Sequence, residues 1–200
     1  AALLGFAVGV PVGTAIALWR PRPRAWATAV VHTGLAFPPV VVGLFVYMLL
    51  SRRGPLGDLA WLFTPAAMVL AQFILAGPYV AAITLAGMQQ VPADLRLQAM
   101  GLGASRWQAL ALQLREARGA IAAAAAAGFG AVLSEVGAVM IVGGNIAGRT
   151  RVLTTAIVLE TRRGAFARAL ALGCILLAVA FVVNLLIVRA QARGPRRWWT

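Results

Sequence analysis

Long apolar segments separated by short polar ones dominate the pattern of this chain. A hydrocarbon core of roughly 30 Å needs about 20 helical residues, and several segments reach that length almost without charge. The alternation of apolar and polar residues that is typical of strands is absent. The pattern therefore predicts an all-α integral membrane protein, one domain over residues 1–200, with five transmembrane helices at 1–19, 25–50, 61–88, 117–142 and 166–189.

Proline and glycine interrupt several of these segments. Gly9, Pro11 and Gly13 predict an interruption of the first span. The pair Pro38–Pro39 predicts a kink in mid-membrane, because proline rings cannot satisfy the hydrogen-bond ladder of a helix. Gly77–Pro78 predicts a second kink in the third span.

The fourth segment, residues 117–142, is dominated by alanine and glycine. Small residues let helix backbones approach closely in lipid, so we expect a central, tightly packed helix. Gly143–Gly144–Asn145 predicts its end, because glycine adopts the left-handed conformation that terminates helices. Residues 152–161 are apolar but cover only about half a bilayer, which indicates a re-entrant or interfacial segment.

Residues 91–118 form a polar interruption between two strongly apolar segments. Gly101 and Gly103 divide it into two amphipathic pieces, and Ser105 with Gln108 three residues later predicts a capping box. The apolar face of the second piece repeats at helical spacing and comprises Trp107, Leu110, Ala111, Leu114 and Ala117. We predict two short helices lying along a surface, with a solvated loop as the alternative.

Composition supports a membrane location and constrains the partners. Hydrophobic residues make up 62% of the 200 residues and charged residues 12%, with a mean hydropathy of +0.87. The formal net charge of +13 comes from arginine, since lysine is absent. Arginines that flank spans anchor to anionic headgroups, so membrane lipid and not nucleic acid is the expected partner of this charge.

Arginine also indicates the orientation. With five spans and a cytoplasmic tail, eleven of the eighteen arginines lie on the cytoplasmic side, together with residues 91–118. This modest excess favours that orientation. Because the chain begins at Ala1 without methionine or a basic leader, we expect a fragment or trimmed start and no signal peptide.

Placing the Glu135 carboxylate within the membrane costs more free energy than placing any other residue of this sequence there. Glu135 is therefore a functional candidate. A structural ion pair or a protonated, hydrogen-bonding role is the alternative. Ser134 and Asn145 add polarity to the same end of the segment.

The sequence contains no recognisable catalytic set. Cys174 and His32 are the only residues of their types, and there is no HExxH and no GxxxxGK[ST]. We expect no enzymatic activity, no metal site and no cofactor bound by this chain.

Two groups of residues carry a family resemblance. Leu97–Gln98–Ala99, Gly103 and Leu114 follow the cytoplasmic EAA signature of ABC importer permeases, although Leu97 and Gln98 replace its first two residues and Arg115 replaces a proline. Gly128–Phe129–Gly130, Leu133 to Ala138 and Gly143 to Ile157 form a more specific match. The chain resembles type I ABC importer permeases of the oxyanion branch, first those for tungstate and then those for molybdate and sulfate.

The resemblance implies the partners and the location. It implies a multi-pass protein of the bacterial plasma (inner) membrane that pairs with a second copy of itself. A separate ATPase, which binds ATP and Mg, would lie below the pair, and an extracytoplasmic binding protein above it. Residues 91–118 would be the coupling helix, with ATPase contacts at Asp94, Arg96, Gln98, Gly103, Ser105 and Arg106.

The translocation path is expected to pass the polar end of the fourth span. The candidates for its lining or gate are Ser134, Glu135, Asn145, Thr154, Thr155, Pro38 and Pro39. An ionised carboxylate would repel a dianion, so we expect Glu135 to be paired or protonated near a helix seam. Arg149 and Arg151 at the outer mouth would attract the anion or meet an acidic surface of the binding protein. An ion-coupled secondary transporter or channel is the alternative function.

Overall fold

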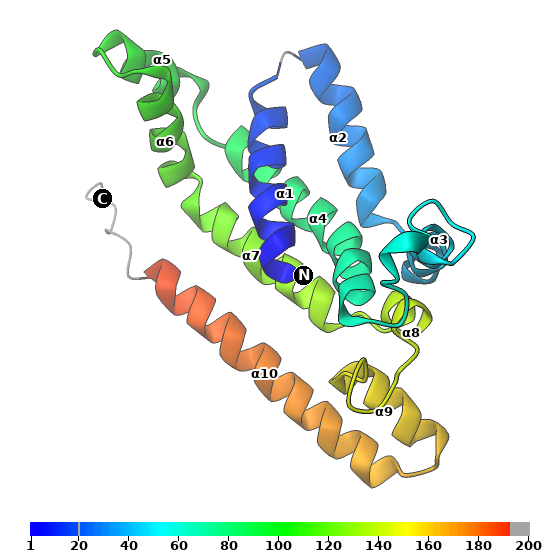
Figure 1. Ribbon diagram of the computed structural model, residues 1–200. Coiled ribbons are helices and arrows are strands. Elements are labelled where there is room, and N and C mark those ends of the chain that lie inside the picture. Colours follow the sequence, from blue (N-terminus) through cyan, green and yellow to red (C-terminus); the bar gives the residue numbers. More distant parts are fainter. Residues whose placement is uncertain (20, 193–200) are drawn as a thin grey trace.

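A computed structural model describes residues 1–19 and 21–192 of the chain. The basic tail with Trp198–Trp199, expected at the membrane interface, lies outside the described residues. Every regular element in the described part is helical, as the sequence predicts (Figure 1). The elements are α1 Ala2–Ala17, α2 Pro21–Leu35, α3 Pro39–Leu50, the 3-10 helix η1 Gly57–Leu59, α4 Pro65–Gln89, α5 Ala93–Gly101, α6 Arg106–Glu116, α7 Arg118–Leu133, α8 Gly137–Gly143, α9 Leu153–Arg162 and α10 Phe166–Ala192.

α1 and α4 form the most extensive helix pair of the described chain. Gly5, Gly9 and Gly13 lie one turn apart on α1, and all three are buried. A Cβ atom on Gly13 would overlap the carbonyl oxygen of Ala81 and lie 3.0 Å from the backbone nitrogen of Leu85. The prediction that Gly9, Pro11 and Gly13 interrupt the first span is wrong, because α1 continues through all three. The missing side chains of the glycines bring α1 against α4.

The second and fourth predicted spans are each divided into two helices. α2 and α3 meet at 97°, since Pro38 and Pro39 offer no N–H to continue the ladder. The expected single helix over residues 117–142 is also wrong: α7 ends at Leu133 and α8 begins at Gly137. α4, in contrast, is a single continuous helix across Gly77–Pro78.

Only α4 and α10 are individually long and apolar enough to cross a membrane within the described residues. The number rises to four if each bent pair, α2 with α3 and α6 with α7, forms one span. α1 is apolar but shorter. The described chain is thus an apolar helical protein, and the count of five spans stays a prediction.

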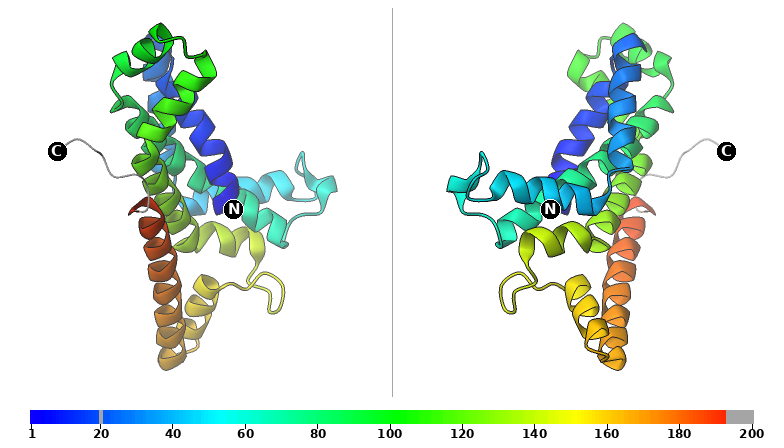
Figure 2. Two further views of the ribbon diagram at one scale, coloured as in Figure 1. Left: turned by 90° about the vertical axis from the view of Figure 1, so that its left-hand side faces the viewer. Right: turned by 90° about the vertical axis from the view of Figure 1, so that its right-hand side faces the viewer.

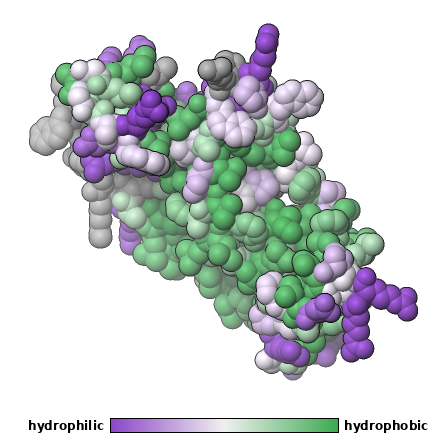
Figure 3. Space-filling model, turned by 45° about the horizontal axis from the view of Figure 1, so that its top comes forward, coloured by the Kyte–Doolittle hydropathy of each residue, from purple (hydrophilic) through white to green (hydrophobic). Residues whose placement is uncertain are grey.

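The helices are arranged along one long axis. α5 and α6 lie at one end and the turn between α9 and α10 at the other, while α3 extends sideways (Figure 2). Hydrophobic residues cover the middle of the surface in Figure 3, and hydrophilic residues gather toward the two ends. α3, α4 and α8 share a buried cluster that includes Val46, Met68 and Val139. This cluster packs α8, which follows the break after Leu133, against α3 and α4.

Candidate functional site

α5 and α6 form an arm at one end of the molecule, which we call the α5–α6 arm (residues 93–116). Ser105 Oγ accepts a hydrogen bond from the backbone N–H of Gln108 at 3.3 Å, and the backbone N–H of Ser105 donates to Gln108 Oε1 at 2.8 Å. The predicted capping box is confirmed. Gly103 has a φ of +91°, a conformation that favours glycine, and it makes the predicted bend between the two helices.

The outer part of the arm exposes large apolar side chains. Leu102 is 90% exposed and Trp107 80% exposed. Trp107 thus belongs to an exposed part of the predicted apolar face. The first turn of α6 lies beyond the end of the bundle, and the packed face begins with Ala109 and Gln113, which are buried.

The residues expected to contact an ATPase divide into two groups. Asp94, Gln98, Gly103, Ser105 and Arg106 are exposed on the arm. Arg96 is half-buried and lines a pocket between the arm and the bundle. The structure therefore leaves five of these six residues accessible on the arm, and their contact with an ATPase stays a prediction.

Glu135 lies in the break between α7 and α8 and is only 7% exposed. Its Oε1 accepts a hydrogen bond from the backbone N–H of Ala138 at 2.8 Å, which caps the start of α8. A carboxylate is favourable there, because the first N–H groups of a helix are unpaired and carry partial positive charge. Glu135 forms no ion pair within residues 1–19 and 21–192. The backbone N–H of Ala138 is thus the specific partner of Glu135 in the alternative, structural role.

α9 is joined to this break by a hydroxyl group. Thr154 Oγ1 donates to the backbone oxygen of Glu135 at 3.1 Å, and both residues are buried. Thr155 is fully buried, and its hydroxyl bonds to the backbone of Val152, where it caps the start of α9. Ser134 is exposed and donates to Gly130 O at 2.9 Å within α7. The side chains of all four predicted polar residues near the break therefore form hydrogen bonds with backbone groups. These residues are Ser134, Glu135, Thr154 and Thr155.

The bend between α2 and α3 lies beside the break between α7 and α8. A Cβ atom on Gly137 would lie 3.1 Å from Val40 Cγ2 and 3.7 Å from Glu135 Oε1. Val40 follows Pro38 and Pro39 directly, so these prolines reach the neighbourhood of Glu135. The two interruptions of helical structure occur at one place in the molecule.

The loop between α8 and α9 is organised by residues that the sequence indicates only in part. Gly144 and Asn145 have φ angles of 70° and 50° and end α8 as predicted. Arg149 and Arg151 are both exposed, and Arg151 Nε donates to Asn145 Oδ1 at 3.3 Å. Thr150, which was not a candidate, is buried and donates to Gly143 O at 2.6 Å. A threonine after Gly148–Arg149 gives no pattern that reveals this role.

A pocket of about 570 Å³ adjoins the break. Its polar lining comes from Gln72 of α4, Arg151 and Thr154, and its other walls are mainly apolar. Gln72 Nε2 also donates to Val132 O at 3.3 Å, near the end of α7. Gln72 was not among the candidates selected from the sequence. The pocket offers a guanidinium, an amide and a hydroxyl to a small polar solute.

Loss of the Glu135 carboxylate tests the capping role. We expect Glu135→Ala to lower the free energy of unfolding by about 1 kcal/mol, because the Ala138 N–H loses its acceptor. Glu135→Gln retains an acceptor oxygen and should unfold close to the wild type. Thermal unfolding of the detergent-purified variants measures this difference, and a Gln variant with intact uptake but sharply altered substrate selectivity would contradict the structural role.

These features define a class of protein. An apolar, arginine-rich helical bundle with two adjacent helix breaks, a buried carboxylate and a polar-lined pocket is the architecture of a membrane transport component. Residues 9–194 match the family described as binding-protein-dependent transport system inner membrane components, and the chain belongs to this family. It is therefore a permease of the inner membrane.

Individual relatives match most of the chain. A probable anion ABC transporter permease protein of Haloferax volcanii is 45% identical over 98% of this chain and 87% of its own length. The tungstate uptake permease TupB of Peptoclostridium acidaminophilum is 37% identical over 96% of this chain and 84% of its own. TupB of Campylobacter jejuni is 42% identical over 78% and 65%, respectively. These relatives agree with the oxyanion resemblance.

Proposed function

We propose that this chain is the permease subunit of an ATP-driven importer that moves an oxyanion, tungstate in the first place, from a binding protein into the cell. The observation that carries this proposal is the identity of 37% to a tungstate uptake permease over 96% of the chain. Two copies of the chain would form the pore, and a separate ATPase would hydrolyse ATP.

The α5–α6 arm would receive the movement of the ATPase. Its exposed Leu102 and Trp107 offer apolar surface for docking, and Asp94 and Arg106 offer charges around it. Polar residues around an apolar centre are typical of protein interfaces. α6 continues into α7 across a bend of 65°, and α7 ends at the break beside Glu135. A displacement of the arm would thus reach the break through two consecutive helices.

The polar groups near the break suit a tetrahedral anion. The Glu135 carboxylate is buried and engaged with Ala138, so its charge does not point into open solvent. Gln72, Arg151 and Thr154 line the adjacent pocket and include hydrogen-bond donors and one positive charge. We propose that these groups, with Asn145, guide the anion, and that exposed Arg149 meets the binding protein.

Uptake measurements in cells that lack their own tungstate importer test the proposal. We expect cellular tungsten, measured by mass spectrometry, to rise only when the chain is expressed with its ATPase and binding protein. An ATPase without its P-loop lysine should abolish the uptake, because nucleotide hydrolysis drives the transport.

A different driving force would give a different result. If uptake persists with the inactive ATPase and collapses on addition of a protonophore, the chain is an ion-coupled secondary transporter. Competition by molybdate and sulfate at equal concentration then ranks the oxyanions that either mechanism accepts.

A further inference from the structure

A second pocket, of about 430 Å³, lies at the end of the molecule that carries the α5–α6 arm. It is enclosed by the last residues of α1 and α4 and by parts of α2, α5 and α6. Four polar side chains contribute to its lining: Arg24, Gln89, Arg96 and Gln113. The helix break and the pocket beside Gln72 lie elsewhere, so the transport path described above does not use these groups.

Two guanidinium groups from different helices line this pocket and have no partner within residues 1–19 and 21–192. Arg24 of α2 and Arg96 of α5 are both half-buried, and neither forms an ion pair or a side-chain hydrogen bond with another described residue. Charged groups withdrawn from water require compensation by an opposite charge. Arginine presents a planar fork of N–H donors that matches the oxygens of a phosphate group. The pocket is therefore suited to an anion.

Gln113 sets a second requirement for a ligand of this pocket. Its side chain lines the same pocket and is only 7% exposed, and its Oε1 has no hydrogen-bond partner among the described residues. A buried acceptor without a donor is costly, so a fitting ligand supplies an O–H or N–H as well as anionic oxygens. Tungstate and other fully deprotonated oxyanions have no such donor.

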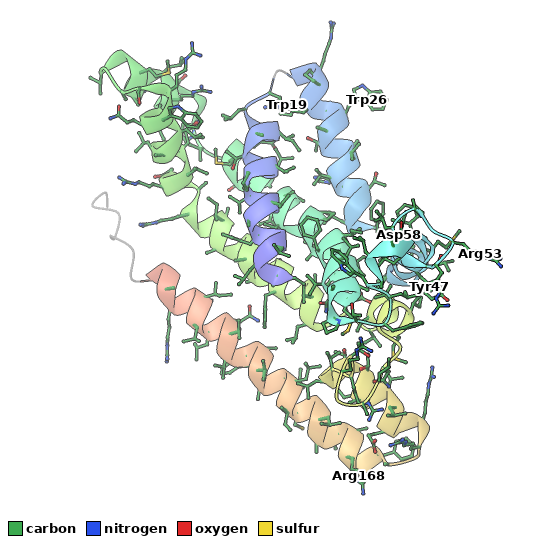
Figure 4. The ribbon with its side chains drawn as sticks, viewed as in Figure 1. Trp19, Trp26, Tyr47, Arg53, Asp58 and Arg168 are labelled. Carbon is green, nitrogen blue, oxygen red and sulfur yellow. The ribbon has the colours of Figure 1, made fainter. Side chains whose placement is uncertain are left out.

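The position of the pocket matches the headgroup layer of a membrane. Trp19, which follows α1, and Trp26 on α2 lie at the same end of the molecule as the pocket and are exposed (Figure 4). Exposed tryptophans of membrane proteins concentrate where hydrocarbon meets water. Basic pockets between helices on the cytoplasmic side are the usual sites for anionic headgroups.

We propose that this pocket binds a phosphate group accompanied by a hydroxyl donor, as found in a phosphatidylglycerol headgroup or in free hydrogen phosphate. The phosphate oxygens bind Arg24 and Arg96, and the hydroxyl donates to Gln113 Oε1. The ligand joins α2 of the bundle to α5 of the arm. Phosphatidylcholine lacks the donor and places a cation near the two arginines.

Ligand titrations of the full chain in detergent test the site. Native mass spectrometry and thermal unfolding are followed with dihexanoyl phosphatidylglycerol, dihexanoyl phosphatidylcholine and sodium phosphate, since a ligand of the folded state raises the unfolding temperature. We expect one phosphatidylglycerol per chain, bound at least about tenfold more tightly than phosphatidylcholine, because charge-assisted hydrogen bonds are the strong ones. If sodium phosphate binds as tightly as phosphatidylglycerol, the natural ligand is the free anion.

Substitutions in matched pairs locate the site. Arg24→Gln and Arg96→Gln should each weaken phosphatidylglycerol binding about tenfold. Arg22→Gln and Arg115→Gln, which alter exposed arginines of α2 and α6 outside the lining, should leave binding unchanged. Equal binding of both lipids, no binding of any of the three ligands, or an equal effect of Arg22→Gln and Arg24→Gln would overturn the proposal. If a variant fails to fold, the comparison of the three ligands on the wild-type chain still tests the proposal.

Discussion

A Gly13→Leu substitution is expected to leave little folded permease in the membrane. A side chain at this position of α1 would collide with the backbone of α4 at Ala81 and Leu85 and with Thr84. Overpacking commonly costs roughly 1–3 kcal/mol even where side chains can adjust, and here the obstacle is backbone. Because α1 and α4 form the most extensive helix pair, their separation should release α1 from the bundle. Detergent extraction followed by size-exclusion chromatography measures the folded yield.

Gly173→Leu is the matched control for this prediction. Gly173 also lies within an apolar helix, α10, but a Cβ atom there would meet no atom within 4 Å. The same substitution should therefore leave the yield and the elution profile close to those of the wild type. Equal yields of the two variants would show that the close approach of α1 and α4 is not needed for folding.

The pairing of α1 with α4 illustrates what the sequence could not reveal. Gly5, Gly9 and Gly13 have the four-residue spacing of a close-packing face, but glycine together with Pro11 also fits a broken helix. The choice depends on whether another helix with small residues lies opposite, and that is a property of the fold. The capping box of Ser105 and Gln108 was predicted correctly, because it depends only on residues that are neighbours in the sequence.

The break after Leu133 was missed for a related reason. Residues 119–142 are apolar apart from Ser134 and Glu135 and are rich in alanine and glycine, so the composition predicts one helix. In the structure the Glu135 carboxylate caps the start of α8. The hydroxyl of Thr154, nineteen residues later, donates a hydrogen bond to the backbone oxygen of Glu135. Sequence reasoning selected both residues as polar candidates. It assigned Thr154 to the lining of a passage and expected Glu135 to be paired or protonated near a helix seam. Their backbone partners become visible only in the fold.

A Gly103→Asp variant is expected to remain folded but to lose both its ATPase partner and its uptake activity. Gly103 has a φ of +91°, where a side chain introduces strain of about 1–3 kcal/mol, and a Cβ atom there would touch no other atom within 4 Å. The damage is thus confined to the bend of the α5–α6 arm. A changed bend moves Leu102 and Trp107 relative to each other, so the docking surface no longer fits. This prediction rests on the proposed function, and affinity purification of the permease with the ATPase quantified in the eluate measures it.

Gly164→Asp provides the same change at the other end of the molecule. Gly164 has a φ of +75° and equally open surroundings, and it lies in the turn between α9 and α10. The strain and the added charge are alike in the two variants, but only Gly103 belongs to the arm. We expect at least about a tenfold lower ATPase recovery with Gly103→Asp and wild-type recovery with Gly164→Asp, since 1.4 kcal/mol corresponds to a factor of ten. Full recovery and full uptake with Gly103→Asp would mean that the bend of the arm does not transmit ATP hydrolysis, and the exposed apolar residues beside it would then need a different partner.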